Sequence, residues 1–170
     1  NIPFVAYTPF ATERKLTVKK LINATWKIVG KEKFSAGYVY ASSLALSSDG
    51  TPYVVYSDRD NGSKVTVMKF NGTDWNILGV AGFSAGVAND PSISISNEGV
   101  PYVAYQDGKN SFKITVMKYN GTAWVAVGSP GFSAGTAANI SLKLAQNSTP
   151  YVAYQDYANA NKISVMKYNG

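Results

Sequence analysis

The chain has 170 residues, of which 45% are hydrophobic and 15% are charged, as in a globular protein that buries a sizeable core. It contains no cysteine and no histidine, which excludes disulfides, thiolate metal sites and chemistry that depends on an imidazole. The formal net charge is +6, but the lysines are spread along the chain, whereas a nucleic-acid footprint needs clustered basic residues. We therefore expect no nucleic-acid partner. No apolar run approaches the roughly 20 residues of a membrane helix, so we expect no membrane span.

A 49-residue repeat organises the whole sequence. Three residue types recur at this interval, at Pro3, Pro52, Pro101 and Pro150, at Trp26, Trp75 and Trp124, and at Phe34, Phe83 and Phe132. The copies follow one another without long insertions or deletions. The repeat divides the chain into a partial unit 1–37, full units 38–86 and 87–135, and a partial unit 136–170.

Strand signals follow one another in the same order along each unit. The chain opens on IPFVAY (2–7), which corresponds to the second strand of a unit, and it ends on the third strand of another. The four strands of the unit 87–135 are SISIS (92–96), PYVAYQ (101–106), KITVMKY (113–119) and WVAVG (124–128). Period-two alternation marks the first of these, and a proline suits the start of the second. The dipeptide Asn120-Gly121 predicts a tight hairpin between the last two.

Four short antiparallel strands per unit, at a period of about 40–50 residues, predict an all-β fold, a β-propeller of four-stranded blades. The segment 113–119 carries bulky apolar groups on both faces, as a blade packed between two neighbours requires. Serines on the first strand, such as Ser92 and Ser94, suit the crowded region around a propeller axis. A β-solenoid is the main alternative, but its coils are usually shorter.

The number of units bears on assembly. Propellers usually close with about 4–8 blades, and an open stack exposes apolar faces and strand edges. We therefore expect either that chains self-associate to close a ring or that the chain is a fragment of a longer propeller.

The pentapeptide GFSAG, at 82–86 and 131–135, matches the nucleophile elbow G-x-S-x-G, and KFSAG (33–37) is a near copy. That elbow needs a helix after the serine and a histidine partner, whereas here a loop and a strand follow. A serine–lysine pair stays open as an alternative. We interpret the motif as the crossing between blades, anchored by its phenylalanine, and we predict no catalytic residue and no enzymatic activity.

The recurring aromatic and acidic side chains are the candidate ligand-binding residues. They are Trp26, Trp75 and Trp124, Asp58, Asp107 and Asp156, and Phe34, Phe83 and Phe132. An indole face can receive the apolar face of a sugar, and a propeller that repeats a weak site gains affinity through multivalency. Blade packing for the tryptophans and turn chemistry for the aspartates are the alternatives.

Acidic residues give little support to catalysis or metal binding. No pair of carboxylates recurs in each unit, as a glycosidase site repeated with the blades would require. SSDGTP (47–52) only faintly resembles the Asp-box of sialidases, and no D-x-D-x-D-G calcium loop is present. We expect no metal and no cofactor.

The segments 50–79, 99–128 and 148–170, with a diverged copy at 2–30, resemble the repeats of secreted bacterial β-propellers. In that group G-T-P-Y-V-A-Y-x-D is followed by K-I-T-V-M-K-Y-N-G-T-x-W-V-x-V-G. More distantly, the layout is similar to lectin propellers of the tachylectin type. The resemblance implies an extracellular or cell-surface location and glycans as partners. The leading hypothesis is a carbohydrate-binding module; the alternatives are a self-assembling scaffold and a fragment of a propeller enzyme.

Overall fold

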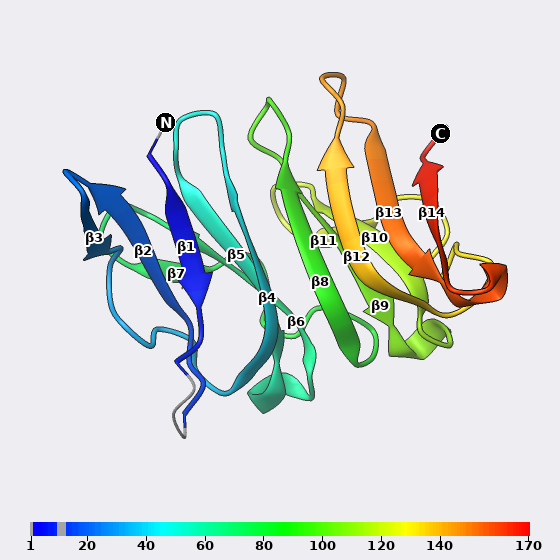
Figure 1. Ribbon diagram of the computed structural model, residues 1–170, viewed down its shortest axis with the longest axis horizontal. Coiled ribbons are helices and arrows are strands. Elements are labelled where there is room, and N and C mark those ends of the chain that lie inside the picture. The colour runs from blue at the N-terminus through cyan, green and yellow to red at the C-terminus, as the bar shows by residue number, and fades with distance from the viewer. Residues whose placement is uncertain (1, 10–12) are drawn as a thin grey trace.

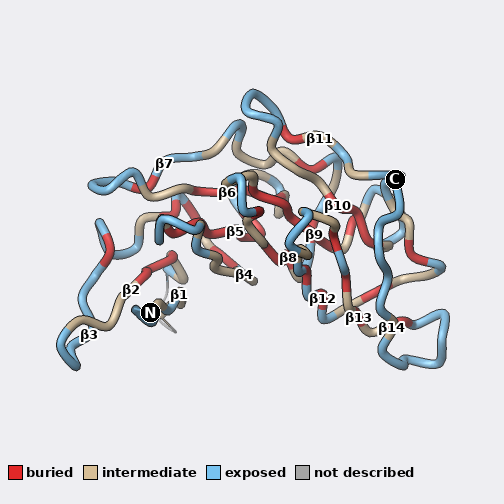
Figure 2. Tube along the Cα trace, turned by 90° about the horizontal axis from the view of Figure 1, so that it is seen from above, coloured by how far each residue is buried: buried red, intermediate tan, exposed pale blue. Residues whose placement is uncertain are grey.

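The computed structural model describes residues 2–9 and 13–170, which form fourteen strands in four antiparallel sheets. The sheets stand side by side in Figure 1, and from above they follow an open arc (Figure 2). The helical segments are single 3-10 turns, η1 (Arg59–Asn61), η2 (Gly108–Asn110) and η3 (Tyr157–Asn159). None of the helices in the described ranges has the length and apolar character needed to span a membrane.

Each sheet is a meander in which successive strands of the chain pair with one another. We call the sheets blades I to IV. Blade I contains β1 (Phe4–Tyr7), β2 (Thr17–Ile22) and β3 (Thr25–Ile28), and blade II contains β4 (Val39–Leu46), β5 (Pro52–Asp58), β6 (Lys64–Phe70) and β7 (Trp75–Ile77). Blade III contains β8 (Ala88–Ile95), β9 (Pro101–Asp107), β10 (Lys113–Tyr119) and β11 (Trp124–Ala126), and blade IV contains β12 (Ala137–Leu144), β13 (Pro150–Asp156) and β14 (Lys162–Lys167).

The strand positions agree with the repeat. Blades II and III have four strands each, and the described strands of blade I correspond to the second, third and fourth of a unit. Those of blade IV correspond to the first, second and third. Each sheet lies inside one of the four ranges into which the repeat divides the chain. The all-β fold class predicted from the 49-residue period is confirmed.

The last two strands of a blade are joined by the predicted asparagine–glycine hairpin. In blade III, Asn120 Oδ1 accepts hydrogen bonds from the backbone N–H groups of Thr122 and Ala123, at 3.0 and 2.8 Å. Asn71 makes the same pair of bonds in blade II. The side chain thereby satisfies the donors of the turn, which is the local reason why the chain reverses here.

The innermost strands of blades II, III and IV lie next to one another near the centre of the arc. Ser43 Oγ on β4 accepts a hydrogen bond from the N–H of Ile93 on β8, at 3.4 Å. Ser92 Oγ on β8 accepts one from the N–H of Leu142 on β12, at 3.0 Å. Small hydroxyl side chains therefore let three strands approach closely and also bond them, in agreement with the prediction for this strand.

The innermost strands of blades II, III and IV each carry a register shift near their beginning. The shift lies between Val39 and Ser42 in β4, and between Asn89 and Ser92 in β8. In β8 the irregularity puts Asp90 in the left-handed region, at φ +46°. Such bulges bend a strand and redirect its side chains, and here Asp90 Oδ2 accepts the N–H of Asn139 on blade IV at 2.9 Å.

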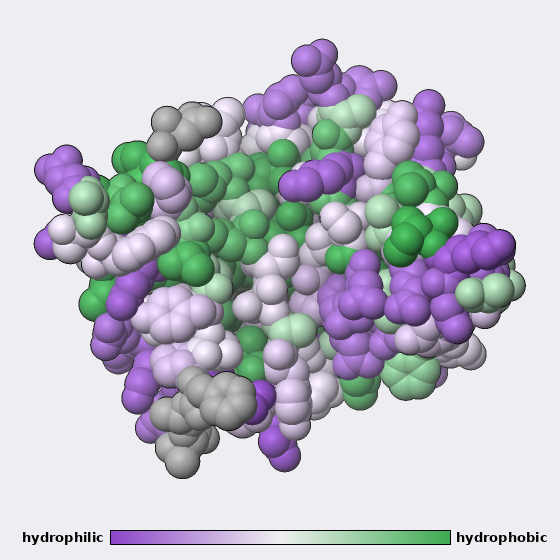
Figure 3. Space-filling model, viewed as in Figure 1, coloured by the Kyte–Doolittle hydropathy of each residue, from purple (hydrophilic) through white to green (hydrophobic). Residues whose placement is uncertain are grey.

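The core lies between the blades. Val54 and Val55 on β5 are both fully buried, although neighbouring residues on a strand point to opposite faces. Val54 packs into the cluster between blades I and II, with Leu16, and Val55 packs into the cluster between blades II and III, with Val103. Both faces of a blade are therefore buried, as predicted. The apolar surface in Figure 3 gathers where β1 lies beside β4 and β5.

Buried tyrosines cross these clusters. The hydroxyl of Tyr56 donates to Sδ of Met68 at 3.6 Å, and that of Tyr105 to Sδ of Met117 at 3.3 Å. Burial is the main cause that raises the pKa of both phenols, and the carboxylate two residues further along the strand adds a smaller increase. The raised pKa favours the protonated phenol in the folded state.

Ionisation of the buried tyrosines should destabilise the fold at alkaline pH. Because the folded-state pKa lies above the unfolded value of about 10, the contribution to stability is complete below pH ~10 and falls as pH rises beyond it, by up to about 1.4 kcal/mol per pH unit and tyrosine. Urea unfolding between pH ~9 and ~11.5 measures the decline. Tyr105→Phe should lessen it, whereas Tyr157→Phe, at an exposed position, should not. An identical decline in both variants would contradict the assignment.

Candidate functional site

Two of the three repeated tryptophans hold the blades together. The ring of Trp75 stacks on Phe34 at 4.5 Å between centroids and 7° between planes, and the ring of Trp124 stacks on Phe83 at 4.4 Å and 6°. The indole N–H of Trp75 donates to the carbonyl of Val29 at 2.9 Å. Trp124 donates to Leu78 at the same distance. Each indole on the outer strand of one blade is thus anchored to the loop that leaves the previous blade.

These contacts show how the tryptophans pack, whereas their predicted role in ligand binding stays a prediction. Trp75 and Trp124 are buried with a phenylalanine over one face, so blade packing is the role that the structure gives them. Trp26 is different because it is 46% exposed. Of the three, Trp26 is the one whose ring is open to a solvent-borne ligand, and sugar stacking by this residue remains a prediction.

Replacing an anchored tryptophan should destabilise the protein far more than replacing the exposed one. Trp124→Ala removes a buried ring, its stack on Phe83 and its hydrogen bond, and should cost about 3–5 kcal/mol in the free energy of unfolding. Trp26→Ala, the matched control, should cost less than about 1 kcal/mol. Denaturant unfolding measures both values. Similar decreases in the free energy of unfolding for the two variants would contradict a stabilising role of the Trp124–Phe83 stack.

The repeated aspartates are buried and support the 3-10 turns. Asp107 Oδ2 accepts hydrogen bonds from Thr115 Oγ1 at 2.7 Å and from Asn110 Nδ2 at 2.8 Å. Its Oδ1 accepts the backbone N–H of Lys109 at 3.0 Å. Asp58 and Asp156 occupy the same position before η1 and η3 and are also buried. Asp58 differs in that its Oδ2 accepts from Asn61 and Thr66 while its buried Oδ1 has no hydrogen-bond partner among the described residues. The ligand-binding role of the three carboxylates stays an untested prediction.

The serine of each F-S-A-G segment also has a structural partner on each side. Ser84 Oγ accepts the backbone N–H of Val65 at 3.1 Å and donates to the carbonyl of Gly86 at 2.7 Å. Ser35 and Ser133 make the equivalent pairs of bonds, and all three are buried. Through these two hydrogen bonds the serine hydroxyl joins the crossing loop to the third strand of the blade, and we call this arrangement the clasp.

The alternative of a catalytic serine–lysine pair can be examined at one S-x-x-K sequence, which lies on β14. Ser164 and Lys167 in SVMK have the S-x-x-K spacing, but residues three apart on a strand point to opposite faces. Ser164 Oγ donates to Asp156 Oδ2 at 2.8 Å. The lysine is therefore not placed to take a proton from this serine.

Ser84→Ala should destabilise the fold and reveal the clasp. It leaves the buried N–H of Val65 without an acceptor, which costs about 1–3 kcal/mol. Ser133→Ala should behave in the same way, because Ser133 accepts from Ile114. Ser129→Ala is the control, because Ser129 lies in the same loop as Ser133 and is exposed. Thermal unfolding measures the effect, and unchanged stability in Ser84→Ala would contradict it.

A groove between blades II and III gathers polar and aromatic groups from both. It has a volume of about 510 Å³ and is lined by Tyr40 on β4, Ser57 and Ser63 beside η1, Asn89 and Asp90 on β8, and Gln106 on β9. Tyr40 is 56% exposed. Asn89 Nδ2 donates to Gln106 Oε1 at 2.7 Å, so the two amides form one pair along the wall. Gln106 Nε2 also donates to the carbonyl of Ala137 on blade IV at 2.6 Å, which fixes the orientation of this amide pair.

Two further aromatic and basic side chains lie beside the groove. The rings of Tyr38 and Tyr40 pack at 4.9 Å with 59° between their planes. The guanidinium of Arg59 lies 5.5 Å from the ring centre of Tyr38 and 5.7 Å from that of Tyr40. Cation–π contacts of this kind hold aromatic rings in place at a surface, so Tyr40 is supported from behind while part of its ring stays open.

The groove residues departed from the repeat, which is why sequence reasoning passed over them. Tyr38 and Tyr40 correspond by the 49-residue interval to Val87 and Asn89 in the next unit. A search for residues that recur in every unit selects the packing residues and discards these. The signal that could have identified Tyr38 and Tyr40 is their difference from the corresponding residues of the next unit, in a repeat that is otherwise close.

Comparisons with known proteins support the fold. The chain matches no protein-family model and no curated protein sequence. Among solved structures it is similar to the Aleuria aurantia lectin in complex with Fucα1-6GlcNAc, with a TM-score of 0.65 and 15% identity, covering 100% of this chain and 57% of the lectin. The fold is that of a β-propeller.

Two further structures show how widely this architecture is used. A fucose lectin from Kordia zhangzhouensis in complex with methyl-fucoside gives a TM-score of 0.51 at 14% identity, covering 76% of this chain and 93% of that one. The Penicillium chrysogenum α-L-arabinanase complexed with arabinobiose gives 0.58 at 12% identity, covering 98% and 58%. The chain thus spans little more than half of the Aleuria lectin and of the arabinanase, and most of the Kordia lectin.

Proposed function

We propose that this propeller is a non-enzymatic carbohydrate-binding module whose sugar site is the groove between blades II and III. The observation that carries the proposal is an exposed tyrosine ring, Tyr40, that lines one groove together with amide, carboxyl and hydroxyl side chains. A sugar offers an apolar face and a rim of hydroxyls, so it is matched by an aromatic platform with fixed polar groups beside it. The lectins among the structural neighbours support carbohydrate as the ligand class.

The carboxylates favour binding over hydrolysis. Glycosidases use two carboxyl groups about 5–9.5 Å apart, one of them kept protonated as an acid. Of the described residues that line the groove, Asp90 is the single carboxylate, and its Oδ2 accepts the N–H of Asn139 at 2.9 Å. Hydrogen bonds from the Ser47 hydroxyl and the Thr51 backbone lower the pKa of Asp49 to about 2. Asp49 lies outside the groove, in the turn after β4, and a carboxyl group so readily ionised is a poor proton donor near neutral pH.

The proposed site is a single one rather than one per blade. In the unit that follows, Asn89 stands where Tyr40 stands, and Ala138 follows at the next interval. The aromatic platform is therefore present once in the described chain. We expect affinity typical of one shallow site, and stronger binding to a surface that displays many sugars.

Tyr40→Ala should weaken sugar binding without unfolding the protein, because the side chain is largely exposed. A glycan array identifies the sugar, and calorimetric titration measures its affinity, which should fall about two- to tenfold, since stacked aromatic contacts contribute roughly 0.5–1.5 kcal/mol. Tyr151→Ala, on β13 and also exposed, is the matched control and should bind as the parent chain does.

Two results would contradict this site. One is an array without any response. The other is binding that survives Tyr40→Ala and is lost in Trp26→Ala, which would move the site to the exposed tryptophan predicted from the repeat. Recovery of the bound sugar as a hydrolysed product would overturn the non-enzymatic assignment.

A further inference from the structure

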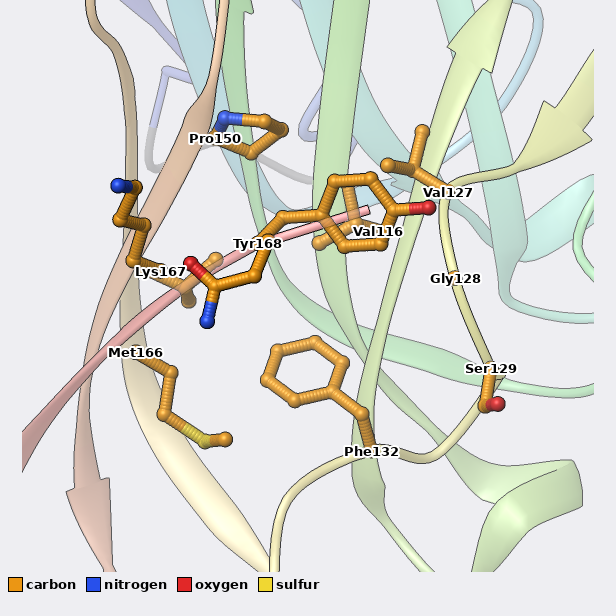
Figure 4. A pocket seen from close by; sticks show the side chains of 11 residues that line it. Val116, Val127, Gly128, Ser129, Phe132, Pro150, Met166, Lys167 and Tyr168 are labelled. Carbon is orange, nitrogen blue, oxygen red and sulfur yellow. The ribbon is translucent and has the colours of Figure 1, made fainter.

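Two hollows between blades differ in their chemistry. The one between blades III and IV is lined mainly by apolar side chains, and the rings of Phe132 and Tyr168 project towards its opening (Figure 4). By the 49-residue interval these rings correspond to Phe83 and Tyr119, which pack on Trp124 in blade III, so this hollow is a packing position of the repeat. The sugar groove between blades II and III is lined mainly by polar side chains, and their charges and hydrogen bonds decide what it binds.

Both arginines of the chain lie on the pair of tyrosines beside this groove. The guanidinium of Arg14, which precedes β2, lies 5.2 Å from the ring centre of Tyr38. The guanidinium of Arg59, on η1, lies 5.5 Å from the same ring and 5.7 Å from the ring centre of Tyr40. Because Tyr40 lines the groove, Arg59 places a permanent positive charge next to the proposed sugar platform.

Arg59 departs from the repeat, as the two tyrosines do. The 49-residue interval places Gly108 and Tyr157 at its position in the next two units. An arginine also differs chemically from the lysines that make up the rest of the basic residues, because its planar guanidinium packs on aromatic rings and presents a fork of N–H donors that matches a carboxylate. This blade therefore carries a cation suited to carboxylates where the two following units have none.

The Arg59 guanidinium is exposed, and within the described ranges it forms no ion pair with a carboxylate. The two acidic residues next to it in the chain are placed otherwise. Asp58 is buried and accepts hydrogen bonds within its own blade. The carboxyl group of Asp60 lies against Gly37 of the crossing loop. Arg59 thus lacks an anionic partner, which a ligand can supply.

The other polar groups of the groove suit sugar hydroxyls better than a carboxylate. Asn89 Nδ2 donates to Gln106 Oε1, and Gln106 Nε2 donates to the carbonyl of Ala137, so one hydrogen of each amide is already engaged. The ionised carboxyl group of Asp90 only accepts hydrogen bonds and repels another anion. A ligand carboxylate therefore finds its charged donors at Arg59.

We propose that the groove binds an acidic sugar, whose carboxylate pairs with the Arg59 guanidinium while its ring lies on Tyr40 and its hydroxyls donate to Asp90 and to Asn89 Oδ1. This inference rests on the proposed sugar site and names the class of sugar that fills it. The two charges orient the ligand, because Arg59 belongs to blade II and Asp90 to blade III. Uronic acids and sialic acids have the required chemistry, a carboxylate attached to a pyranose ring.

A glycan array that carries uronic-acid and sialic-acid oligosaccharides beside neutral ones tests the class. Each acidic oligosaccharide that binds is then titrated by calorimetry beside its methyl ester, which keeps the shape of the sugar and removes its charge. The acid should bind at least about tenfold more tightly than the ester, because charge-assisted hydrogen bonds are roughly twice as strong as neutral ones. Added salt should reduce this difference.

Variants of the protein assign the preference to one side chain. Arg59→Gln should abolish the preference for the acid and leave binding of the ester unchanged, whereas Arg59→Lys should keep part of it, because an ammonium group retains the charge and loses the fork. Lys162→Gln removes one positive charge from an exposed position on β14 and is the matched control, which should bind as the parent chain does. Tyr40→Ala should weaken binding of acid and ester by the same factor.

The inference and the sugar site fail in different ways. Neutral sugars or esters that bind as tightly as the acids, and lose binding in Tyr40→Ala, would remove the acidic ligand and leave the sugar site standing. A preference for the acid that survives Arg59→Gln would place the carboxylate elsewhere. Equal binding of sulfated glycans would show general attraction of anions to a basic protein, not recognition of a carboxylate. An array without any response would contradict the sugar site and the inference together.

Discussion

Burial of both faces of the central blades II and III is the constraint on which the rest of the structure depends. Val54 and Val55 are adjacent in the chain, point in opposite directions and are both fully buried, in two different clusters. A sheet with one wet face would expose one of them. A blade is therefore stable only between neighbours, and stability accumulates along the stack as in other repeat proteins.

The F-S-A-G segment connects one blade to the next and also takes part in the packing between them. Its phenylalanine receives the tryptophan of the following blade, and its serine clasps the third strand of the preceding one. Gly86 is needed because a Cβ there would lie 2.8 Å from the backbone nitrogen of Lys109. Phe83, Ser84 and Gly86 of the pentapeptide that resembles a nucleophile elbow thus each have a packing role in the connection between two blades.

Residues that repeat do structural work, and the candidate site is built where the repeat is broken. Trp75, Trp124 and Asp107 are fully engaged inside the fold, although their recurrence made them the natural candidates for a multivalent ligand site. Tyr38 and Tyr40 depart from the repeat and line or support the groove. In a chain of close repeats, a packing role keeps a position alike in every unit, whereas a local site needs to be made only once.

The 49-residue period, the two-sided apolar strands and the asparagine–glycine turns were enough to determine the strands, their order and the blade architecture, because these depend on local periodicity and on contacts repeated in every unit. Which aromatic rings are buried and which are open was decided only by the tertiary structure. Trp26 and Trp124 have the same place in the repeat, yet one is exposed and the other covered. Trp124 is covered by Phe83 and bonded to the carbonyl of Leu78, both in the preceding unit, so its burial depends on a contact between residues more than 40 positions apart in the chain.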